Sequence, residues 1–244
     1  MSQTIRLSER GVRVFAGRLY NHDYLWFSSN EISKVSTTQP LLHNYALCYA
    51  LSQRSYRTCV GSTPKYAEEA EREFGAMPLY ATPAFASQVQ RTTITFNAVD
   101  ALTLTTGDSK RMNTPNIGKR VYLNLLWEPR ELEKPQAGYE FYVFVFGDYA
   151  LPRVLRLGKK GAPVRVRWEE LPKAVAVFRE QPHRPSHVVN PLDVNGRLIS
   201  YEPMSIPPHL LLRNVTLDHD WFVFSGRHAV QVPKRVLARA GGTG

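Results

Sequence analysis

Residues 153–168 of the chain read RVLRLGKKGAPVRVRW, with six cationic side chains and no acidic one. Apolar residues give both flanks strand propensity, and Gly158 and Gly161 bracket Lys159 and Lys160. Glycine reaches positive φ and lets another backbone approach closely, and lysine supplies charge without a fixed hydrogen-bonding geometry. The pattern predicts a basic loop between two strands that contacts a polyanion. The flanks add four arginines, Arg153, Arg156, Arg165 and Arg167.

A solvated turn is the alternative explanation, because glycine and lysine are common in turns that bind nothing. The unbroken positive charge over both flanks favours the polyanion. The whole chain shares this character: its 244 residues carry a formal net charge of +10. Such a charge points to an anionic partner, either nucleic acid or a membrane surface.

No apolar run approaches the length of about 18 residues that crosses a membrane, and the N-terminal MSQTIRLSER lacks the apolar core of a signal peptide. We therefore expect a cytoplasmic protein without a membrane partner. Its only cysteines, Cys48 and Cys59, exclude a disulfide framework and a four-cysteine zinc site, and we expect both to be buried thiols. The sequence predicts one domain over residues 1–240 and a disordered tail, GGTG, at 241–244.

Several segments outside the basic stretch have strand patterns. Tyr139–Phe146, YEFYVFVF, is apolar on nearly both faces and predicts a central strand. A first strand is expected within Gly11–Phe27, and alternation over Arg91–Val99 predicts a half-buried strand. Leu102–Thr105 and Val121–Leu126 predict a projecting hairpin whose tip is either functional or disordered until a partner binds. Its tip carries four cations, Lys110, Arg111, Lys119 and Arg120.

Helical patterns are fewer. Pro40 suits the first turn of a buried helix that runs to Leu51, and Thr63–Gly75 has the caps of a short surface helix. The remaining segments are expected to be a polar connector at 28–39, a short helix or strand at 169–178, an irregular proline-broken region at 181–208, one last strand at 215–223 and a basic tail at 234–239.

These elements together indicate an α+β fold with a ferredoxin-like core and additional strands. Two motifs, LHNYALCYAL at 42–51 and RLGKKGAPVRV at 156–166, resemble the RAMP-fold subunit that caps the five-prime handle of the guide RNA in type I-D CRISPR effector (Cascade) complexes. The resemblance covers most of the chain, from about Val12 to Phe224. It implies an RNA-recognition-like RAMP core, a β-hairpin thumb at about 102–126 and C-terminal β elaborations.

The resemblance also implies partners and contacts. The partners would be the five-prime handle of the guide RNA, the backbone RAMP subunit and the large subunit, with contact to target DNA left open. The RNA contacts would come from the loop Gly158–Gly161 and from the helix motif His43, Asn44 and Tyr45. Helix N-termini favour phosphate, although His43 and Asn44 could equally satisfy local backbone groups.

We expect a non-enzyme without cofactor or metal, since no nucleotide-binding or nucleophile motif is present. The chief rival is a metal-independent ribonuclease that processes guide precursors with His22, Tyr20 and Arg18. A peripheral membrane protein, the third possibility, lacks an amphipathic basic helix.

Three further groups of residues are candidate sites. Pro185 between His183 and His187 argues against a zinc site, and strand alternation is expected to separate His219 from Asp218 and Asp220. The tryptophans are expected mostly in the core, with Trp168 the best candidate to stack on a base; they are Trp26, Trp127, Trp168 and Trp221.

Overall fold

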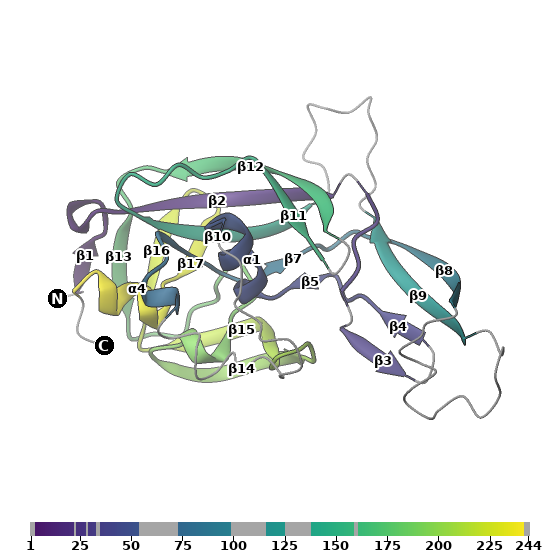
Figure 1. Ribbon diagram of the computed structural model, residues 1–244. Coiled ribbons are helices and arrows are strands. Elements are labelled where there is room, and N and C mark those ends of the chain that lie inside the picture. The colour runs from purple at the N-terminus through teal and green to yellow at the C-terminus, as the bar shows by residue number, and fades with distance from the viewer. Residues whose placement is uncertain are drawn as a thin grey trace.

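The computed structural model describes residues 3–21, 23–27, 29–32, 35–53, 73–98, 116–124, 138–158 and 161–241. Strands predominate, and the helices with assigned bounds are α1 (Asn44–Leu51), α4 (Lys234–Arg239) and the short 3-10 turns η1 (Ser8–Arg10) and η2 (Pro191–Asp193). The chain therefore has an α+β fold built mainly from β-sheet (Figure 1).

A curled seven-stranded sheet forms the centre of the molecule, in the order β11-β12-β2-β10-β7-β5, with β6 also paired to β10. Its strands are β11 (Val154–Leu157), β12 (Ala162–Leu171), β2 (Val12–Asn21), β10 (Tyr139–Phe146), β7 (Ala84–Phe85), β5 (Leu41–Leu42) and β6 (Leu79–Ala81). The central position predicted for Tyr139–Phe146 is confirmed, because β10 pairs with β2 on one side and with β6 and β7 on the other.

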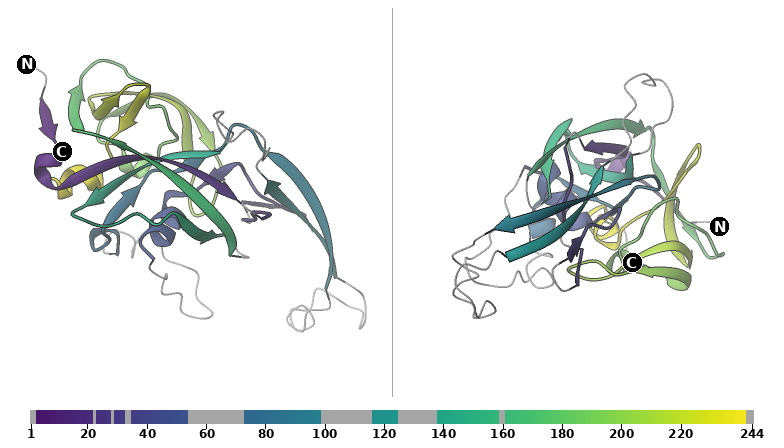
Figure 2. Two further views of the ribbon diagram at one scale, coloured as in Figure 1. Left: turned by 90° about the horizontal axis from the view of Figure 1, so that it is seen from above. Right: turned by 90° about the vertical axis from the view of Figure 1, so that its right-hand side faces the viewer.

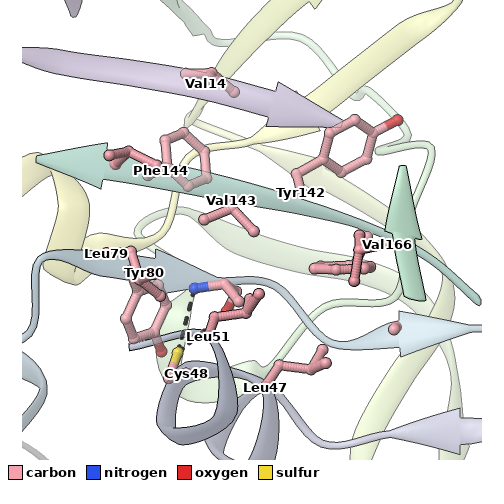
Figure 3. Close-up of a cluster of buried hydrophobic side chains, with 14 of the residues drawn as sticks. Val14, Leu47, Cys48, Leu51, Leu79, Tyr80, Tyr142, Val143, Phe144 and Val166 are labelled. Carbon is pink, nitrogen blue, oxygen red and sulfur yellow. Dashed lines mark hydrogen bonds between the residues drawn. The ribbon is translucent and has the colours of Figure 1, made fainter. Parts of the chain in front are cut away.

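Helix α1 covers one face of this sheet. In Figure 3, Leu47 and Leu51 of α1 lie below Val143 of β10, while Phe144 points to the opposite face. The thiol of Cys48 is buried and accepts a hydrogen bond of 3.2 Å from the backbone N–H of Ala81. Cys48 is thus a structural residue of the core, as expected. Cys59 lies outside the described residues.

The opposite face of the central sheet packs in part against a second sheet, of order β1-β13-β16-β17. Its strands are β1 (Thr4–Arg6), β13 (Val175–Arg179), β16 (Asp220–Ser225) and β17 (His228–Gln231). Trp221 and Val223 share one core with Val12 and Val14 of the central sheet. A separate ribbon pairs β14 (Arg197–Met204) with β15 (Leu211–Asp218), and Figure 2 shows these C-terminal elements beside the central sheet.

A third group of strands projects away from this body (Figures 1 and 2), in the order β3-β4-β9-β8. Its members are β3 (Asn30–Ile32), β4 (Val35–Thr37), β9 (Asn116–Asn124) and β8 (Gln90–Ala98). The hairpin β8–β9 runs in register from Gln90 opposite Asn124 to Ala98 opposite Asn116.

Several sequence-based boundaries are corrected. The hairpin begins at Gln90 rather than at Leu102, and Lys119 and Arg120 lie within β9 instead of at the tip. Lys110 and Arg111 lie outside the described residues. The supposed connector at 28–39 contains β3 and β4, because β4 pairs with β9, far away in sequence, and β3 pairs with β4.

The C-terminal third also differs from expectation. The segment 181–208 contains η2 and β14, and 234–239 forms helix α4 with Val236 and Leu237 buried. Residues 169–178 divide between the end of β12 and β13. The expected last strand is two strands, since the backbone turns at His219 with a φ of 52°.

The first helix is shorter than predicted. Leu41 and Leu42 pair with Phe85 and Ala84 as β5, and α1 starts only after His43, which caps it. Sheet pairing therefore overrides the helical signal of Pro40. Of the predicted helix at 63–75, only residues 73–75 are described; they are helical, and Phe74 is buried.

A ferredoxin-like unit would place a second helix between its third and fourth strands. The described residues between β10 and β12 carry β11 in that place. Among the described residues, none of the helices is both long and apolar enough to cross a membrane.

Candidate nucleic-acid interface

The basic stretch forms an antiparallel pair of strands whose two faces differ sharply in character. Leu155, Val164 and Val166 are buried, whereas Arg156, Arg165 and Arg167 are exposed. Side chains of a strand alternate between its faces, so the arginines line one outer surface. The next strand, β2, extends this surface, because Tyr20 lies opposite Arg165 and Arg18 opposite Arg167. We call this surface the basic face; it comprises Arg18, Tyr20, Arg156, Arg165 and Arg167.

Contacts within the basic face hold its charges in place. The guanidinium of Arg167 lies 5.6 Å from the centroid of the Tyr20 ring, which is only 4% exposed. Arg18 forms an ion pair with Glu140 of β10. Arg18 is thus partly neutralised, while Arg165 and Arg167 present their charge to solvent.

The turn that joins the two strands requires both glycines. Gly158 and Gly161 have φ values of 79° and 62°, where side chains are strained. A Cβ at Gly158 would also lie 2.8 Å from the backbone oxygen of Trp26. Arg156 donates to the backbone oxygen of Gly161 at 3.0 Å, which anchors the far end of the turn. Lys159 and Lys160, between the glycines, lie outside the described residues.

Arg153, the first arginine of the stretch, is exposed one residue before β11. Its backbone oxygen accepts a hydrogen bond of 2.9 Å from the N–H of Val166. Every described arginine of the predicted stretch is therefore exposed.

A groove of about 460 Å³ adjoins the basic face, between the central sheet and the turn that joins β16 to β17. Its lining includes five acidic or basic residues and one histidine: Arg18, Glu140, Arg167, Glu169, Arg227 and His228. Cations and aromatic rings in a concave site suit the phosphates and bases of a single-stranded nucleic acid.

Hydrogen bonds fix one wall of the groove. The hydroxyl of Tyr142 lies 2.9 Å from Oγ of Ser186 and 2.8 Å from Nδ1 of His228. Burial raises the pKa of Tyr142. Nε2 of His228 is 3.8 Å from a carboxylate oxygen of Glu169.

Sequence reasoning missed the groove. Tyr142 and His228 come from segments that only the tertiary structure brings together. Arg227 follows Gly226 in a hairpin turn, a local signal of the kind that revealed the loop at 158–161.

The helix motif lies elsewhere, inside the protein. Asn44 is fully buried, its Nδ2 donates to the hydroxyl of Tyr80 at 2.9 Å, and its Oδ1 accepts from Asn190 at 3.2 Å. Both ends of its amide are therefore bound within the protein, and we leave Asn44 out of the proposed interface.

The neighbours of Asn44 are buried too. His43 uses Nδ1 to cap α1, accepting from the N–H of Tyr45 at 3.3 Å. Burial, with a smaller contribution from the charge of His209, lowers the pKa of His43 to about 3. Tyr45 is 3% exposed and its hydroxyl lies 3.1 Å from Nε2 of His209. His43 and Tyr45 therefore join α1 to the C-terminal region, and we leave them out of the interface.

The tryptophans that the structure describes pack against protein. Trp168 donates from Nε1 to the backbone oxygen of Pro152 at 3.0 Å, and its ring meets Phe141 edge-on. Trp26 and Trp221 are buried, and Trp127 lies outside the described residues.

The two histidines that are candidate zinc ligands do not meet at one site. His183 packs on Phe222 and Phe224, whereas His187 accepts a hydrogen bond from the N–H of Gln231. Within the ranges that the structure describes, no group of His, Cys, Asp and Glu is arranged to hold a metal ion.

Asp218 and Asp220 also belong to different environments. Asp218 pairs with Arg197 and lies 3.2 Å from Nδ1 of His219. Asp220 is buried and accepts from Asn195. The expectation that alternation separates His219 from Asp218 was wrong, because the chain turns at His219 instead of continuing as a strand.

Comparison with known proteins gives the family. No curated protein matches the chain. A family model described as type I-D CRISPR-associated protein Cas5/Csc1 matches residues 12–241. This match runs from the start of β2 past the end of α4 and so includes the basic face, its glycine turn and the groove. The chain therefore belongs to the type I-D CRISPR-associated Cas5/Csc1 family.

Proposed function

We propose that this chain is a non-catalytic subunit of a type I-D CRISPR effector complex that binds the five-prime handle of the guide RNA on its basic face. The observation that carries the proposal is the outward alignment of Arg156, Arg165 and Arg167 on two paired strands beside a glycine-bracketed turn. Family membership supports a role among other CRISPR subunits. The sheet order β12-β2-β10-β6, with α1 on one face, supports a RAMP-like core.

Arginine suits this role because its guanidinium binds phosphate oxygens in a planar, bidentate geometry. Arg165 and Arg167 stand two residues apart on one strand and so lie about 7 Å apart along it. Neither has an acidic partner among the described residues, in contrast to Arg18, which pairs with Glu140. Contacts of this kind bind the RNA backbone and position it without reading bases.

The environment of the candidate nuclease residues supports binding over catalysis. A general base or acid must reach the reacting group. The ring of Tyr20 is covered by Arg167, and Arg18 is engaged by Glu140. His22 lies outside the described residues.

The same proposal assigns protein partners to other surfaces. The β8–β9 hairpin projects from the body (Figure 1) and would contact the backbone RAMP subunit, with the large subunit adjacent. Contact with target DNA is not part of the proposal.

Salt dependence of RNA affinity tests the proposed interface. Each phosphate neutralised on a single strand contributes about −0.7 to the slope of log affinity against log salt. Replacing Arg165 and Arg167 with Ala should therefore flatten the slope by about 1.4. The control replaces two exposed arginines away from this surface, Arg10 and Arg184, and should leave the slope unchanged.

If the Arg165/Arg167 variant and the control variant show equal salt slopes of RNA affinity, the basic face is not part of the RNA site. Incubation of the purified protein with labelled repeat RNA, without metal, tests the non-catalytic assignment separately. Specific cleavage that disappears in His22→Ala would overturn that assignment in favour of a processing ribonuclease.

A further inference from the structure

A group of aromatic side chains lies where the projecting hairpin joins the body, and the proposed RNA contacts do not include it. Leu25 exchanges two backbone hydrogen bonds of 3.0 Å with Leu123 of β9, and both leucine side chains are fully buried. Residues next to an inward-facing strand residue point the other way. Tyr24 and Trp26 therefore lie on the side opposite to the Leu25 side chain, together with Tyr122.

The rings contact one another and a cation. Tyr122 lies 5.9 Å from Tyr24, edge-on, and 6.3 Å from Trp26, measured between ring centroids. The guanidinium of Arg120 lies 4.2 Å from the centroid of the Trp26 ring. We call these four residues, Tyr24, Trp26, Arg120 and Tyr122, the aromatic cluster.

Only one ring of the aromatic cluster reaches solvent to a large extent. Tyr24 is 41% exposed, whereas Trp26 and Tyr122 are 7% and 6% exposed. The backbone at Tyr24 is held as well, since its N–H donates to Oδ1 of Asp23 at 2.7 Å. Asn21 in turn donates to the backbone oxygen of Asp23 at 2.8 Å. Tyr24 is thus an exposed aromatic ring on a rigid support.

The aromatic cluster also adjoins the basic face. A Cβ at Gly158 would lie 2.8 Å from the backbone oxygen of Trp26 and 3.1 Å from the side chain of Leu25. The glycine turn therefore packs directly against the segment that carries Tyr24. On the other side, β9 contributes Arg120, whose guanidinium lies over the ring of Trp26. The aromatic cluster therefore lies between the glycine turn of the basic face and the cation of Arg120.

We propose that Tyr24 stacks on a base of the single-stranded guide RNA whose phosphates follow the basic face. This inference rests on the proposed function and deepens it by naming a base contact. Single-strand binding sites combine a positive surface that follows the backbone with aromatic rings on which bases stack. The basic face, whose glycine turn packs against this segment, favours RNA over an apolar protein surface as the partner of Tyr24. Stacking does not require a particular base, because every base has a π-face.

The test uses a fluorescein-labelled, 12-nucleotide single-stranded RNA, and the same RNA with one abasic nucleotide placed at each position in turn. Tyr24→Ala should weaken binding of the intact RNA by roughly 5- to 150-fold, as for other base–aromatic stacks. Tyr24→Phe should bind as the wild type does, because it keeps the ring. Tyr24→Leu, which keeps apolar bulk without a π-face, should bind as weakly as Tyr24→Ala.

Tyr201 supplies a matched control. It is 49% exposed on β14, so Tyr201→Ala removes an equally accessible ring from a different surface and should leave affinity unchanged. In the wild type, an abasic nucleotide should cost affinity at one position of the RNA. In the Tyr24→Ala variant, the abasic nucleotide at that position should cause no further loss of RNA affinity, because the stacking contact is already absent.

The outcomes separate this inference from the proposed function. If the wild-type protein does not bind the RNA, the proposed function fails and the inference falls with it. If Arg165→Ala with Arg167→Ala weakens binding but Tyr24→Ala does not, the stacking inference alone is wrong. Loss of co-assembly with a neighbouring protein subunit at unchanged RNA affinity would overturn it as well, and would assign Tyr24 to a protein contact.

Discussion

Asn44 donates a hydrogen bond of 2.9 Å to the hydroxyl of Tyr80 in the interior of the protein. The Tyr80 hydroxyl is also 2.8 Å from both carboxylate oxygens of Asp193 and accepts from Arg235 at 3.1 Å. This buried polar network connects α1, β6, η2 and α4. Its members satisfy one another, which is the condition under which buried polar groups are tolerated.

Asn44→Ala should therefore destabilise the fold and leave RNA binding intact. The substitution leaves Asn190 and Tyr80 each short of one hydrogen bond, and an unsatisfied buried group costs about 1–3 kcal/mol. Urea denaturation should show a loss of this size, while the affinity for single-stranded RNA stays at the wild-type value. A fall in RNA affinity at unchanged stability would return Asn44 to the interface.

Asp193 should make stability depend on pH. Burial raises its pKa from 3.8 to about 7, against the opposing effects of the Tyr80 hydrogen bond and the Arg235 charge. Between about pH 4 and pH 7 the Asp193 carboxyl is ionised in the unfolded chain but keeps its proton in the folded protein. The free energy of unfolding should then fall as pH rises, by about 1.4 kcal/mol per pH unit for this group.

Asp193→Asn removes this titration. Urea denaturation of the wild type and the variant from pH 4 to pH 8 isolates it, because every other group is common to both. The stability of the wild type relative to the variant should decline up to about pH 7 and then level off. Parallel curves over the whole range would show that Asp193 is ionised throughout.

Tyr45 should be a large contributor to core stability. Its ring lies 5.0 Å from that of Phe74, and its hydroxyl bonds to His209. Tyr45→Ala should cost about 3–5 kcal/mol, as for other large aromatic residues in a core. Tyr45→Phe keeps the ring and should cost about 0.5–1.5 kcal/mol for the lost hydrogen bond. Urea denaturation measures both variants. An equal loss of unfolding free energy in the two would contradict a larger contribution from the ring than from the hydroxyl.

The two glycines of the basic turn should differ in their tolerance of a side chain. Both have positive φ, which costs an L-residue about 1–2 kcal/mol. Within 4 Å, a Cβ at Gly161 would otherwise meet only Cδ of the Arg156 side chain, at 3.9 Å. At Gly158 it would press on the Trp26 carbonyl, so Gly158→Ala should cost about 1–3 kcal/mol more than Gly161→Ala.

Urea denaturation of the two glycine variants provides the comparison, with each serving as the control for the other. If the free energy of unfolding falls equally in both variants, the Trp26 backbone moves aside without loss of stability. The close packing of Gly158 against Trp26 would then not contribute to the stability of the turn.

Local patterns in the sequence were sufficient for the parts of the fold that depend on neighbouring residues. The strand propensity of the flanks of 153–168 predicts two strands joined by a glycine-bracketed loop, and the structure pairs β11 with β12. The apolar run Tyr139–Phe146 likewise predicts the central strand. Both predictions rest on strand propensity and apolar content, which a short segment expresses without reference to the rest of the chain.

The position of Asn44 shows what such patterns cannot supply. At the start of a helix, a polar residue can bind a ligand or a protein group, and the local sequence is the same in both cases. Its partners here, Tyr80 and Asn190, stand 36 and 146 residues away. Only the packing of α1 against these distant segments decides that Asn44 is structural.

The sequence by itself therefore determined the charge of the chain, the two basic strands and the need for glycine at their turn. The tertiary structure decided which cations share a surface, because Arg18 and Arg167 meet only through the pairing of β2 with β12. It also created the groove, since Tyr142 and His228 become neighbours only when two sheets pack together. Burial and long-range pairing depend on the whole chain, and for that reason no local pattern specifies them.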